Sequence, residues 1–422
     1  MKVFKFGGAS VKDADAVKNV GSILRNYQDE KLLVVISAMG KTTNGLERML
    51  NAWYDGKPEI ASKELAEIKS FHNKIIGDLI GGDLQNNYHE VDNLFIELEC
   101  YIEPRPVNTD FDFLYDQIVG YGELISTKII STYLQAVNIE NRWLDARNFI
   151  NTSEDYRQAK INWGSTEEII INRLKPLVNR QLVITQGFIG RTNRNNTTTL
   201  GREGSDYSAS VFAYCLDAES VTIWKDVEGV MNADPKRMEN TRIMREISFS
   251  KAIELAYYGA TILHPKTIQP LLRKSIPLYV KSFLNPAAEG SVVKAMIAEN
   301  EESVACYIFK DDQVLLNLSS KDFSFIVESH LSSIFNMLDI FKVQINVMQN
   351  SAISFSFCAN YDERKFVDLI PQLTELFNIE VTKDLTLITL HNYKEKELPE
   401  ILINKEILIE QHSKNVVQYV YR

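Results

Sequence analysis

The chain is poor in residues that bind metals or form disulfides. Its 422 residues include only four cysteines and six histidines. The cysteines form no Cys-x-x-Cys pair and the histidines no His-Glu-x-x-His pattern, which argues against a zinc site. The cysteines are also too scattered for a disulfide framework, so we expect a reducing compartment. They are Cys100, Cys215, Cys306 and Cys358.

Blocks of positive charge and long apolar runs are also absent. Lys and Arg number 46 against 56 Asp and Glu, which gives a net charge of -10. Because no basic block occurs, a nucleic-acid partner is not expected, and an anionic ligand would need local cations. No apolar run reaches about 18 residues, and no charged and apolar leader precedes the first strand. We therefore expect a cytoplasmic protein without a membrane partner.

What the sequence does contain is an alternation of short β-rich runs and amphipathic helical segments. This alternation predicts an α/β fold with a mostly parallel sheet. The predicted strands cover residues 2–6, 31–37, 141–150, 181–189 and 220–225. With 45% hydrophobic residues, the chain can bury a large core, and its length suggests roughly three domains.

Other regions depart from this alternation. Residues 59–101 are polar with a helical period, and we expect a helical excursion near the edge of the sheet. From Ser303 a strand, helix, strand, strand and helix predict a small α+β unit. Residues 385–422 are too few for a core of their own and must pack on another part of the chain. We expect domains at 1–286, 303–384 and 385–422.

The first motif lies at the end of the first predicted strand. Lys5 precedes the pair Gly7 and Gly8, and a helical pattern runs from Val11 to Leu24. Glycines allow backbone N–H groups to approach an anion, and a helix N-terminus favours negative charge. The motif therefore suits phosphate, although a strand, glycine turn and helix also occur for purely structural reasons.

Two further segments place polar groups at the ends of elements. The strand around Val34 runs into Ser37 and then Thr42 and Thr43, where parallel-sheet ligands gather. Either threonine could instead be an ordinary helix N-cap. Glu123 follows Gly120 at the start of a helix, where a carboxylate commonly complements the helix dipole.

The most specific stretch joins Thr185–Gly190 to Thr197–Tyr207. Threonines, glycines and Arg202 precede an apolar helix that we expect Ser205 to cap, a combination that favours anion binding. The segment Trp224–Lys236 ends a strand, and turn chemistry alone accounts for its glycine and its Asp-Pro pair.

Together these motifs resemble the aspartokinases of the amino-acid kinase superfamily, over Met1 to about Pro286. The matching motifs are K-F-G-G-A-S-V, V-I-S-A, G-Y-G-E, Q-G-F-I-G, T-T-L-G-R-E-G-S-D and W-K-D-V-E-G-V. The resemblance implies a three-layer αβα sandwich with ACT-like regulatory domains. It also implies transfer of the γ-phosphoryl of MgATP to the side-chain carboxylate of L-aspartate, the first step of lysine, threonine and methionine biosynthesis.

The resemblance assigns roles residue by residue. Lys5 would stabilise the transferring phosphoryl group, and Asp206 would orient Lys5 or the metal-bound phosphates. Glu123 would hold the substrate ammonium, and Arg202 a substrate carboxylate. The acceptor pocket would also include Ser37, Thr43, Phe188 and Ser205. Nucleotide contacts would come from Gly7, Gly8, Ser10, Lys225, Asp226, Met231, Lys236 and Thr261. ATP and Mg²⁺ are the implied cofactors.

Three positions depart from the usual family pattern. Ala9 replaces a threonine, Glu203 stands where glycine is usual, and Thr261 occupies a position where a lysine often reaches ATP. These changes weaken the phosphate site. Lys225, where a small hydroxyl residue is common, could restore the missing positive charge.

The C-terminal part resembles ACT domains more loosely. Residues 343–354 match the strand, turn and strand that hold an effector in lysine-sensitive members, but Ala352 replaces an acidic residue that often binds the effector amine. ACT units commonly pair across chains, so the resemblance implies a homodimer. Two alternatives to an aspartate kinase stay open: a kinase for another acidic amino acid such as glutamate or acetylglutamate, and a catalytically weak amino-acid sensor.

Overall fold

The computed structural model describes the chain except residues 81–87, 103–109, 261–262, 298–303, 323 and 394–399. The described residues form two compact units. The first contains residues 1–230, 245–252 and 263–297, and the second contains residues 231–244, 253–262 and 298–422. Two segments of the predicted domain 1–286 therefore pack with the C-terminal residues.

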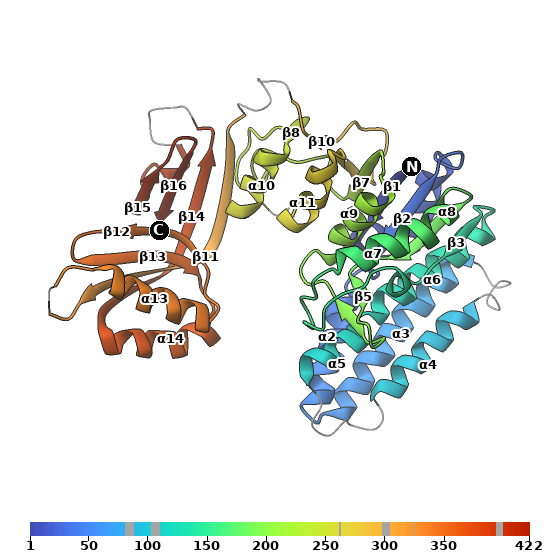
Figure 1. Ribbon diagram of the computed structural model, residues 1–422, viewed down its shortest axis with the longest axis horizontal. Helices are drawn as coiled ribbons and strands as arrows, with labels where there is room; N and C mark the ends of the chain where they lie inside the picture. Colours follow the sequence, from blue (N-terminus) through green and yellow to red (C-terminus); the bar gives the residue numbers. More distant parts are fainter. Residues whose placement is uncertain (81–87, 103–109, 261–262, 298–303, 323, 394–399) are drawn as a thin grey trace. The chain divides into compact units, whose positions relative to one another are not determined.

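The first unit is built around an eight-stranded sheet with the order β3-β4-β2-β1-β7-β9-β10-β8 (Figure 1). Its strands are β1 (Lys2–Phe6), β2 (Leu32–Ile36), β3 (Asn141–Trp143), β4 (Leu182–Gln186), β7 (Ser220–Lys225), β8 (Glu246–Ser248), β9 (Leu278–Ser282) and β10 (Ser291–Lys294). Among these described strands, β9 and β10 form the one antiparallel pair. The predicted, mostly parallel α/β sheet is confirmed.

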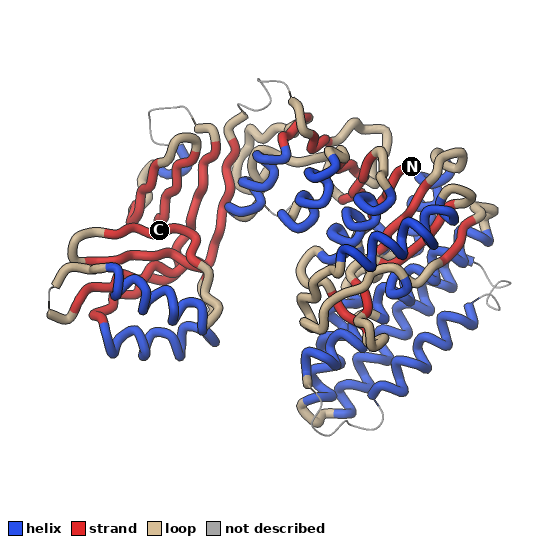
Figure 2. The backbone as a smooth tube through the Cα atoms, in the orientation of Figure 1, coloured by secondary structure: helices blue, strands red, loops and turns tan. Residues whose placement is uncertain are grey.

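The central strands of this sheet are buried on both faces, which accounts for the apolar sequence of β2. All five residues of β2 are buried, and β1 pairs in parallel with β2 and β7. Continuous apolar runs are typical of parallel strands that are covered on both faces. Helices lie on both sides of the sheet (Figure 2): α9 (Gly204–Leu216) packs against β1 and β7, and α6 (Tyr121–Ala136) packs against β3 and β4.

The described parts of the region 59–101 are helical as predicted. They contain α3 (Pro58–Ile80) and α4 (His89–Ile102), which pack on α2 (Thr42–Tyr54) and α6, respectively. The other helices are α1 (Ala14–Arg25), α5 (Phe111–Val119), α7 (Trp163–Ile169), α8 (Lys175–Val178), α10 (Phe249–Tyr258) and α11 (Pro265–Lys274), with 3₁₀ segments η1 (Gly8–Val11) and η3 (Ala146–Asn148) and a π segment η4 (Ile170–Leu174).

Some element boundaries differ from the predictions. The strand predicted at 141–150 ends at Trp143, because the Asp145 carboxylate accepts a hydrogen bond from the Arg147 N–H at 2.9 Å and opens η3. The helix predicted from Val11 begins at Ala14. Its cap is Asp13, whose carboxylate accepts from the Ala16 N–H at 2.8 Å.

The strand predicted at 181–189 is also interrupted. It ends at Gln186, because Phe188 has a left-handed backbone with φ of 68°. The chain then forms a short hairpin of β5 (Ile189–Arg191) and β6 (Thr197–Thr199). This break separates the Gln-Gly-Phe-Ile-Gly motif into a strand end and a turn.

The second unit contains a six-stranded antiparallel sheet with the order β12-β13-β11-β14-β16-β15. Its strands are β11 (Cys306–Ser320), β12 (Ile345–Asn350), β13 (Ser354–Asn360), β14 (Phe377–His391), β15 (Ile407–His412) and β16 (Val416–Tyr421). Two helices, α13 (Glu328–Ile340) and α14 (Glu363–Leu376), share an apolar core with this sheet, and a 3₁₀ segment η5 spans Glu400–Leu402. The element order through α14 is the one predicted from Ser303.

Residues 385–422 extend this sheet. β14 and β11 are each 15 residues long and pair from Cys306 opposite His391 to Ser320 opposite Phe377. The predicted boundary after Asp384 therefore falls inside β14. β16 pairs with the second half of β14, and β15 pairs with β16, so these strands pack on the preceding unit as expected.

The four cysteines are all free, and only Cys100 is exposed. In the ranges that the structure describes, no helix is both long enough and apolar enough to cross a bilayer.

Candidate active site

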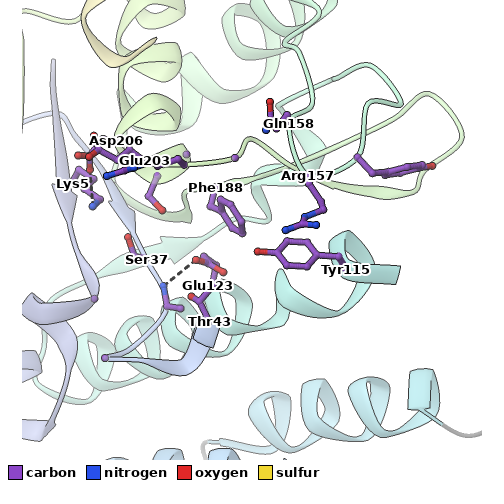
Figure 3. Close-up of a pocket in the computed structure, with 18 of the residues that line it drawn as sticks. Lys5, Ser37, Thr43, Tyr115, Glu123, Arg157, Gln158, Phe188, Glu203 and Asp206 are labelled. Atoms are coloured by element: carbon purple, nitrogen blue, oxygen red, sulfur yellow. Dashed lines mark hydrogen bonds and ion pairs between the residues drawn. The ribbon is translucent and has the colours of Figure 1, made fainter. Parts of the chain in front are cut away.

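A cavity of about 960 Å³ lies in the first unit, where several strands of the sheet end (Figure 3). Lys5 and Lys225 come from β1 and β7, Ser37 follows β2, and Phe188 follows β4. The other lining residues come from helix starts and loops: Gly8, Ala38, Gly40, Thr43, Asp112, Tyr115, Glu123, Tyr156, Arg157, Gln158, Gly201, Arg202, Glu203, Gly204, Ser205 and Asp206. The carboxyl ends of parallel strands are the usual place for a ligand in such a sheet.

Two lysines converge on one buried carboxylate in this cavity. Lys5 Nζ lies 2.6 Å from Asp206 Oδ1, and Lys225 Nζ lies 3.6 Å from Asp206 Oδ2. The side chains of Lys5 and Asp206 are 10% and 4% exposed. Burial alone would raise the pKa of Asp206, but the two ammonium groups outweigh it and lower this pKa below its usual value. Asp206 therefore stays ionised and holds Lys5 in place.

The start of α9 differs from the prediction that Ser205 caps this helix. The helix begins at Gly204, and its N-cap is Glu203, whose side chain makes no capping hydrogen bond. The physical reason is a tight left-handed turn, since Gly201 and Glu203 have φ values of 76° and 54°. Gly204, Ser205 and Asp206 of the first turn line the cavity, and uncapped N–H groups at a helix start favour an anion.

Gly187 lets the end of β4 approach this helix start closely. A Cβ atom at Gly187 would lie 2.6 Å from both Cα and Cβ of Ser205. The neighbouring Phe188 N–H donates to Ser208 Oγ at 3.0 Å, which joins the turn after β4 to α9. The glycine of the Gln-Gly-Phe motif is thus required by packing between two cavity-lining segments.

Glu123 is a buried carboxylate with an unfilled acceptor. Its side chain points into the cavity from the first turn of α6, and its Oε1 accepts a hydrogen bond from the Ala38 N–H at 3.3 Å (Figure 3). Its Oε2 is buried and has no hydrogen-bond partner among the described residues. Burial raises the pKa of Glu123 to about 8, although the Ala38 N–H and Lys5 oppose this. A buried carboxylate with a free acceptor is therefore better explained by the binding of a cationic ligand than by complementation of the helix dipole.

Glu203 introduces a second carboxylate beside the lysines. Its Oε2 is buried without a hydrogen-bond partner among the described residues. Burial raises the pKa of Glu203; the charge on Lys225 opposes this rise, whereas that on Asp206 adds to it. The unusual residue noted at this position therefore faces the lysine that was expected to compensate for it.

Comparison with known proteins identifies the family. Residues 1–282 match the amino acid kinase family. The chain is 31% identical over 396 residues to the lysine-sensitive aspartokinase 3 of Escherichia coli (strain K12), which covers 92% of this chain and 86% of that protein. This chain belongs to the aspartokinases of the amino acid kinase family. It is also 32% identical over 298 residues to bifunctional aspartokinase/homoserine dehydrogenase 2 of Arabidopsis thaliana, but spans only 32% of that longer protein.

Solved aspartokinase structures confirm the fold. E. coli aspartokinase III in complex with lysine and aspartate, in the T-state, matches with a TM-score of 0.83 and 29% identity over 100% of this chain and 95% of that chain. The same enzyme in complex with aspartate and ADP, in the R-state, matches with a TM-score of 0.82 and 28% identity over 100% and 96% of the two chains. The predicted family and the kinase fold followed by a regulatory domain are therefore confirmed.

The structure brings together ten of the residues predicted from the aspartokinase motifs. These ten line the cavity: Lys5, Gly8, Ser37, Thr43, Glu123, Phe188, Arg202, Ser205, Asp206 and Lys225. Thr43 is not the N-cap of α2, which is Lys41, and Thr42 donates its hydroxyl to the Met39 carbonyl at 2.6 Å. The N-cap interpretation of both threonines is therefore wrong.

Six predicted residues remain, and the five of them that the structure describes do not line the cavity. Ser10 is buried and donates its hydroxyl to the Trp224 carbonyl at 3.3 Å, and Asp226 is exposed beyond β7. Met231 and Lys236 belong to the second unit, and Thr261 lies outside the described residues. Gly7 also does not line the cavity, although it directly precedes the cavity-lining Gly8 in the sequence. Their nucleotide contacts stay predictions.

Sequence reasoning missed the part of the cavity formed by α5 and the loop after η3. Asp112 and Tyr115 come from α5, and Tyr156, Arg157 and Gln158 come from the loop. No local motif marks these residues. Arg157 reaches the cavity because its backbone N–H donates to both oxygens of the Asp116 carboxylate, at 3.1 and 3.0 Å, across 41 residues of sequence.

We expect Lys225 and Glu203 to be energetically coupled. Lys225→Ala should raise the KM for ATP about tenfold, because it would remove one cation from the expected phosphate site and leave the Glu203 carboxylate there. Adding Glu203→Gly to this variant should recover about fivefold in kcat/KM, whereas Glu203→Gly alone should change kcat/KM little, which gives a coupling of about 1 kcal/mol. Steady-state kinetics on the two single variants and the double variant measure this coupling. Strictly additive effects would contradict it.

Proposed function

We propose that this aspartokinase transfers the γ-phosphoryl group of MgATP to the side-chain carboxylate of L-aspartate. One observation carries the proposal: a single cavity contains both the Lys5–Asp206–Lys225 cluster and the buried, unfilled oxygen of Glu123. The first group suits a polyphosphate, and the second suits the ammonium of an amino acid. The related E. coli structures in complex with aspartate and with ADP support the same pair of ligands.

The chemistry asks for charge neutralisation and alignment more than for a base. The acceptor carboxylate is already an anion, so no proton has to leave it before it attacks the phosphorus. The obstacle is bringing this anion to a polyphosphate, which the lysines and the N-terminus of α9 reduce. Asp206 would keep Lys5 directed at the transferring group, while Glu123 and Arg202 would fix the acceptor through its ammonium and a carboxylate.

In this scheme the metal ion would bind together with the nucleotide. Among the described residues, no three or more His, Cys, Asp or Glu side chains cluster as a metal site. Mg²⁺ commonly binds through substrate phosphates and one or two carboxylates, and Asp206 or Glu203 could serve as such carboxylates. Bound with ATP, the ion would neutralise charge on the phosphates.

Aspartate-dependent product formation tests the proposal directly. ADP release from MgATP would be measured with L-aspartate, L-glutamate, N-acetyl-L-glutamate or no acceptor, with hydroxylamine present to trap an acyl phosphate as its hydroxamate. We expect turnover and hydroxamate with L-aspartate alone. Turnover with another acceptor would reassign the substrate. Folded protein that is inactive with every acceptor would favour the sensor, for which Ala9, Glu203 and Thr261 are the supporting residues.

The wider setting of the enzyme is part of the same proposal. We propose that it works in the cytoplasm, in amino-acid biosynthesis, and that it is a homodimer paired through its C-terminal unit. The free cysteines are consistent with a reducing compartment. The two edge strands of the six-stranded sheet, β12 and β15, provide edges at which strands of a second copy could pair.

A further inference from the structure

Unusual backbone conformations concentrate around the cavity. Within the described residues, five that are neither Gly, Asn nor Asp have positive φ: Arg157, Phe188, Glu203, Ser275 and Lys342. The first three line the cavity. A left-handed backbone is costly for such side chains, and it persists at functional sites where the surroundings enforce it. Arg157, with φ of 65°, is the one whose side chain carries a positive charge into the cavity.

A buried carboxylate enforces the conformation of Arg157. Asp116 is fully buried in α5 and accepts the Arg157 N–H on both oxygens. It also accepts from the N–H and the hydroxyl of Thr199, at 2.8 and 2.7 Å. The loop is therefore tied to α5 and β6 at the residue that bears the guanidinium.

The guanidinium group of Arg157 is held in position by neighbouring side chains, but only part of its hydrogen-bonding capacity is filled by the described residues. It lies over the ring of Tyr115, 4.5 Å from the centroid, and the Tyr115 hydroxyl donates to Glu47 Oε1 at 2.6 Å. Arg157 Nη1 donates to Asp112 Oδ1 at 3.1 Å, in a half-exposed pair. The other N–H groups of this guanidinium have no acceptor in the part of the chain that the structure describes. Such a fork matches a carboxylate in geometry.

The position of Arg157 indicates which carboxylate it would take. Figure 3 shows Lys5 and Asp206 at one side of the cavity, Arg157 and Tyr115 at the other, and Glu123 and Phe188 between them. An acceptor whose ammonium lies at Glu123 and whose reacting carboxylate faces Lys5 directs its other carboxylate toward Arg157. We propose that Arg157 is an acceptor-binding residue that pairs, alongside Arg202, with the non-reacting α-carboxylate. This assignment rests on the proposed function.

Arg157→Gly separates a binding role from a structural one. Glycine adopts positive φ freely, so the variant keeps the loop and should unfold at the same temperature or higher. We expect its KM for L-aspartate to rise at least about tenfold, with kcat and the KM for MgATP within about threefold of wild type, as for loss of a ground-state contact. Arg194→Ala, which removes an exposed arginine paired with Glu154 outside the cavity lining, is the matched control and should change none of these values.

The α-amide of L-aspartate, which keeps the reacting carboxylate, identifies the contact. Its KM should be nearly equal in wild type and Arg157→Gly. A KM for L-aspartate unchanged by the substitution, or an equal rise for both acceptors, overturns the assignment. If Arg157→Gly fails to fold, Arg157→Lys, which keeps the charge but loses the fork, should give an intermediate KM. Calorimetric binding of L-aspartate without nucleotide tests the contact even if turnover is absent, which separates a failure of this assignment from a failure of the proposed function.

Discussion

Lys5→Ala should lower kcat by about a hundredfold to a thousandfold, the usual loss when a preorganised group that stabilises transition-state charge is removed. Lys5 is buried at the end of the central strand β1 and lies 2.6 Å from Asp206, so its ammonium is fixed before ATP binds. Removing it also leaves the ionised Asp206 with Lys225 as its remaining cation at 3.6 Å, which adds repulsion toward the phosphates. Hydroxamate formation under saturating MgATP and L-aspartate measures the loss.

Lys2→Ala is the matched control for this variant. Lys2 lies on the same strand but pairs with Glu30 at 2.7 Å, away from the cavity lining. Its removal should leave kcat nearly unchanged. Circular dichroism on both variants shows whether the fold is kept. A Lys5→Ala enzyme that is folded and retains wild-type kcat would exclude Lys5 from the phosphoryl-transfer step.

Glu123→Gln should stabilise the substrate-free protein at alkaline pH while weakening its binding of the acceptor. The folded-state pKa of Glu123, about 8, lies above the ordinary value of 4.5 because the carboxylate is buried. The folded state therefore binds a proton that the unfolded state releases, and the free energy of unfolding falls as the pH rises from about 4.5 to 8. A pKa shift of this size lowers the free energy of unfolding by at most about 5 kcal/mol above pH 8.

Thermal unfolding at pH 5.5 and pH 9 tests this linkage. The wild-type melting temperature should fall more than that of Glu123→Gln between the two conditions, because glutamine keeps the shape and the acceptor for the Ala38 N–H without the charge. The exposed Glu140 provides a control, and Glu140→Gln should follow the wild type. Parallel falls in wild type and Glu123→Gln would contradict the prediction.

The same variant should raise the KM for L-aspartate about tenfold to a hundredfold, since a hydrogen bond to a charged group contributes about 1.5–3 kcal/mol. The variant would then be more stable and less active at pH 9. This combination is the usual sign that a buried charge is kept for binding at a cost in stability.

The fold could be predicted where local sequence decides the structure. β1 and β7 have the predicted bounds, because each is a short run rich in β-branched and aromatic residues, and these residues are buried in the sheet. Predictions failed where a single side chain or backbone angle intervened. β3 ends early because the Asp145 carboxylate accepts a hydrogen bond from the Arg147 N–H, and β4 ends because Phe188 has a left-handed backbone. Neither effect has a periodic signal.

The site divides in the same way. Lys5, Glu123 and Asp206 could be predicted, because each lies in a motif at the end of a strand or the start of a helix. Arg157 and Tyr115 could not, because they enter the cavity only through contacts with residues far away in the sequence. A charged residue such as Asp116 within the apolar face of α5 is the one available hint, since a buried carboxylate must find distant donors.

The two halves of the C-terminal unit share one strand. Because β14 pairs with β11 along its length and with β16 along its second half, a chain shortened after Asp384 would end in the middle of a ladder. The backbone of β11 from Cys306 to Lys310 would then lose its neighbour, and an uncovered strand edge of this kind promotes aggregation. The two halves of the C-terminal unit are therefore one folding piece: residues after Asp384 cannot be removed without exposing the backbone of β11.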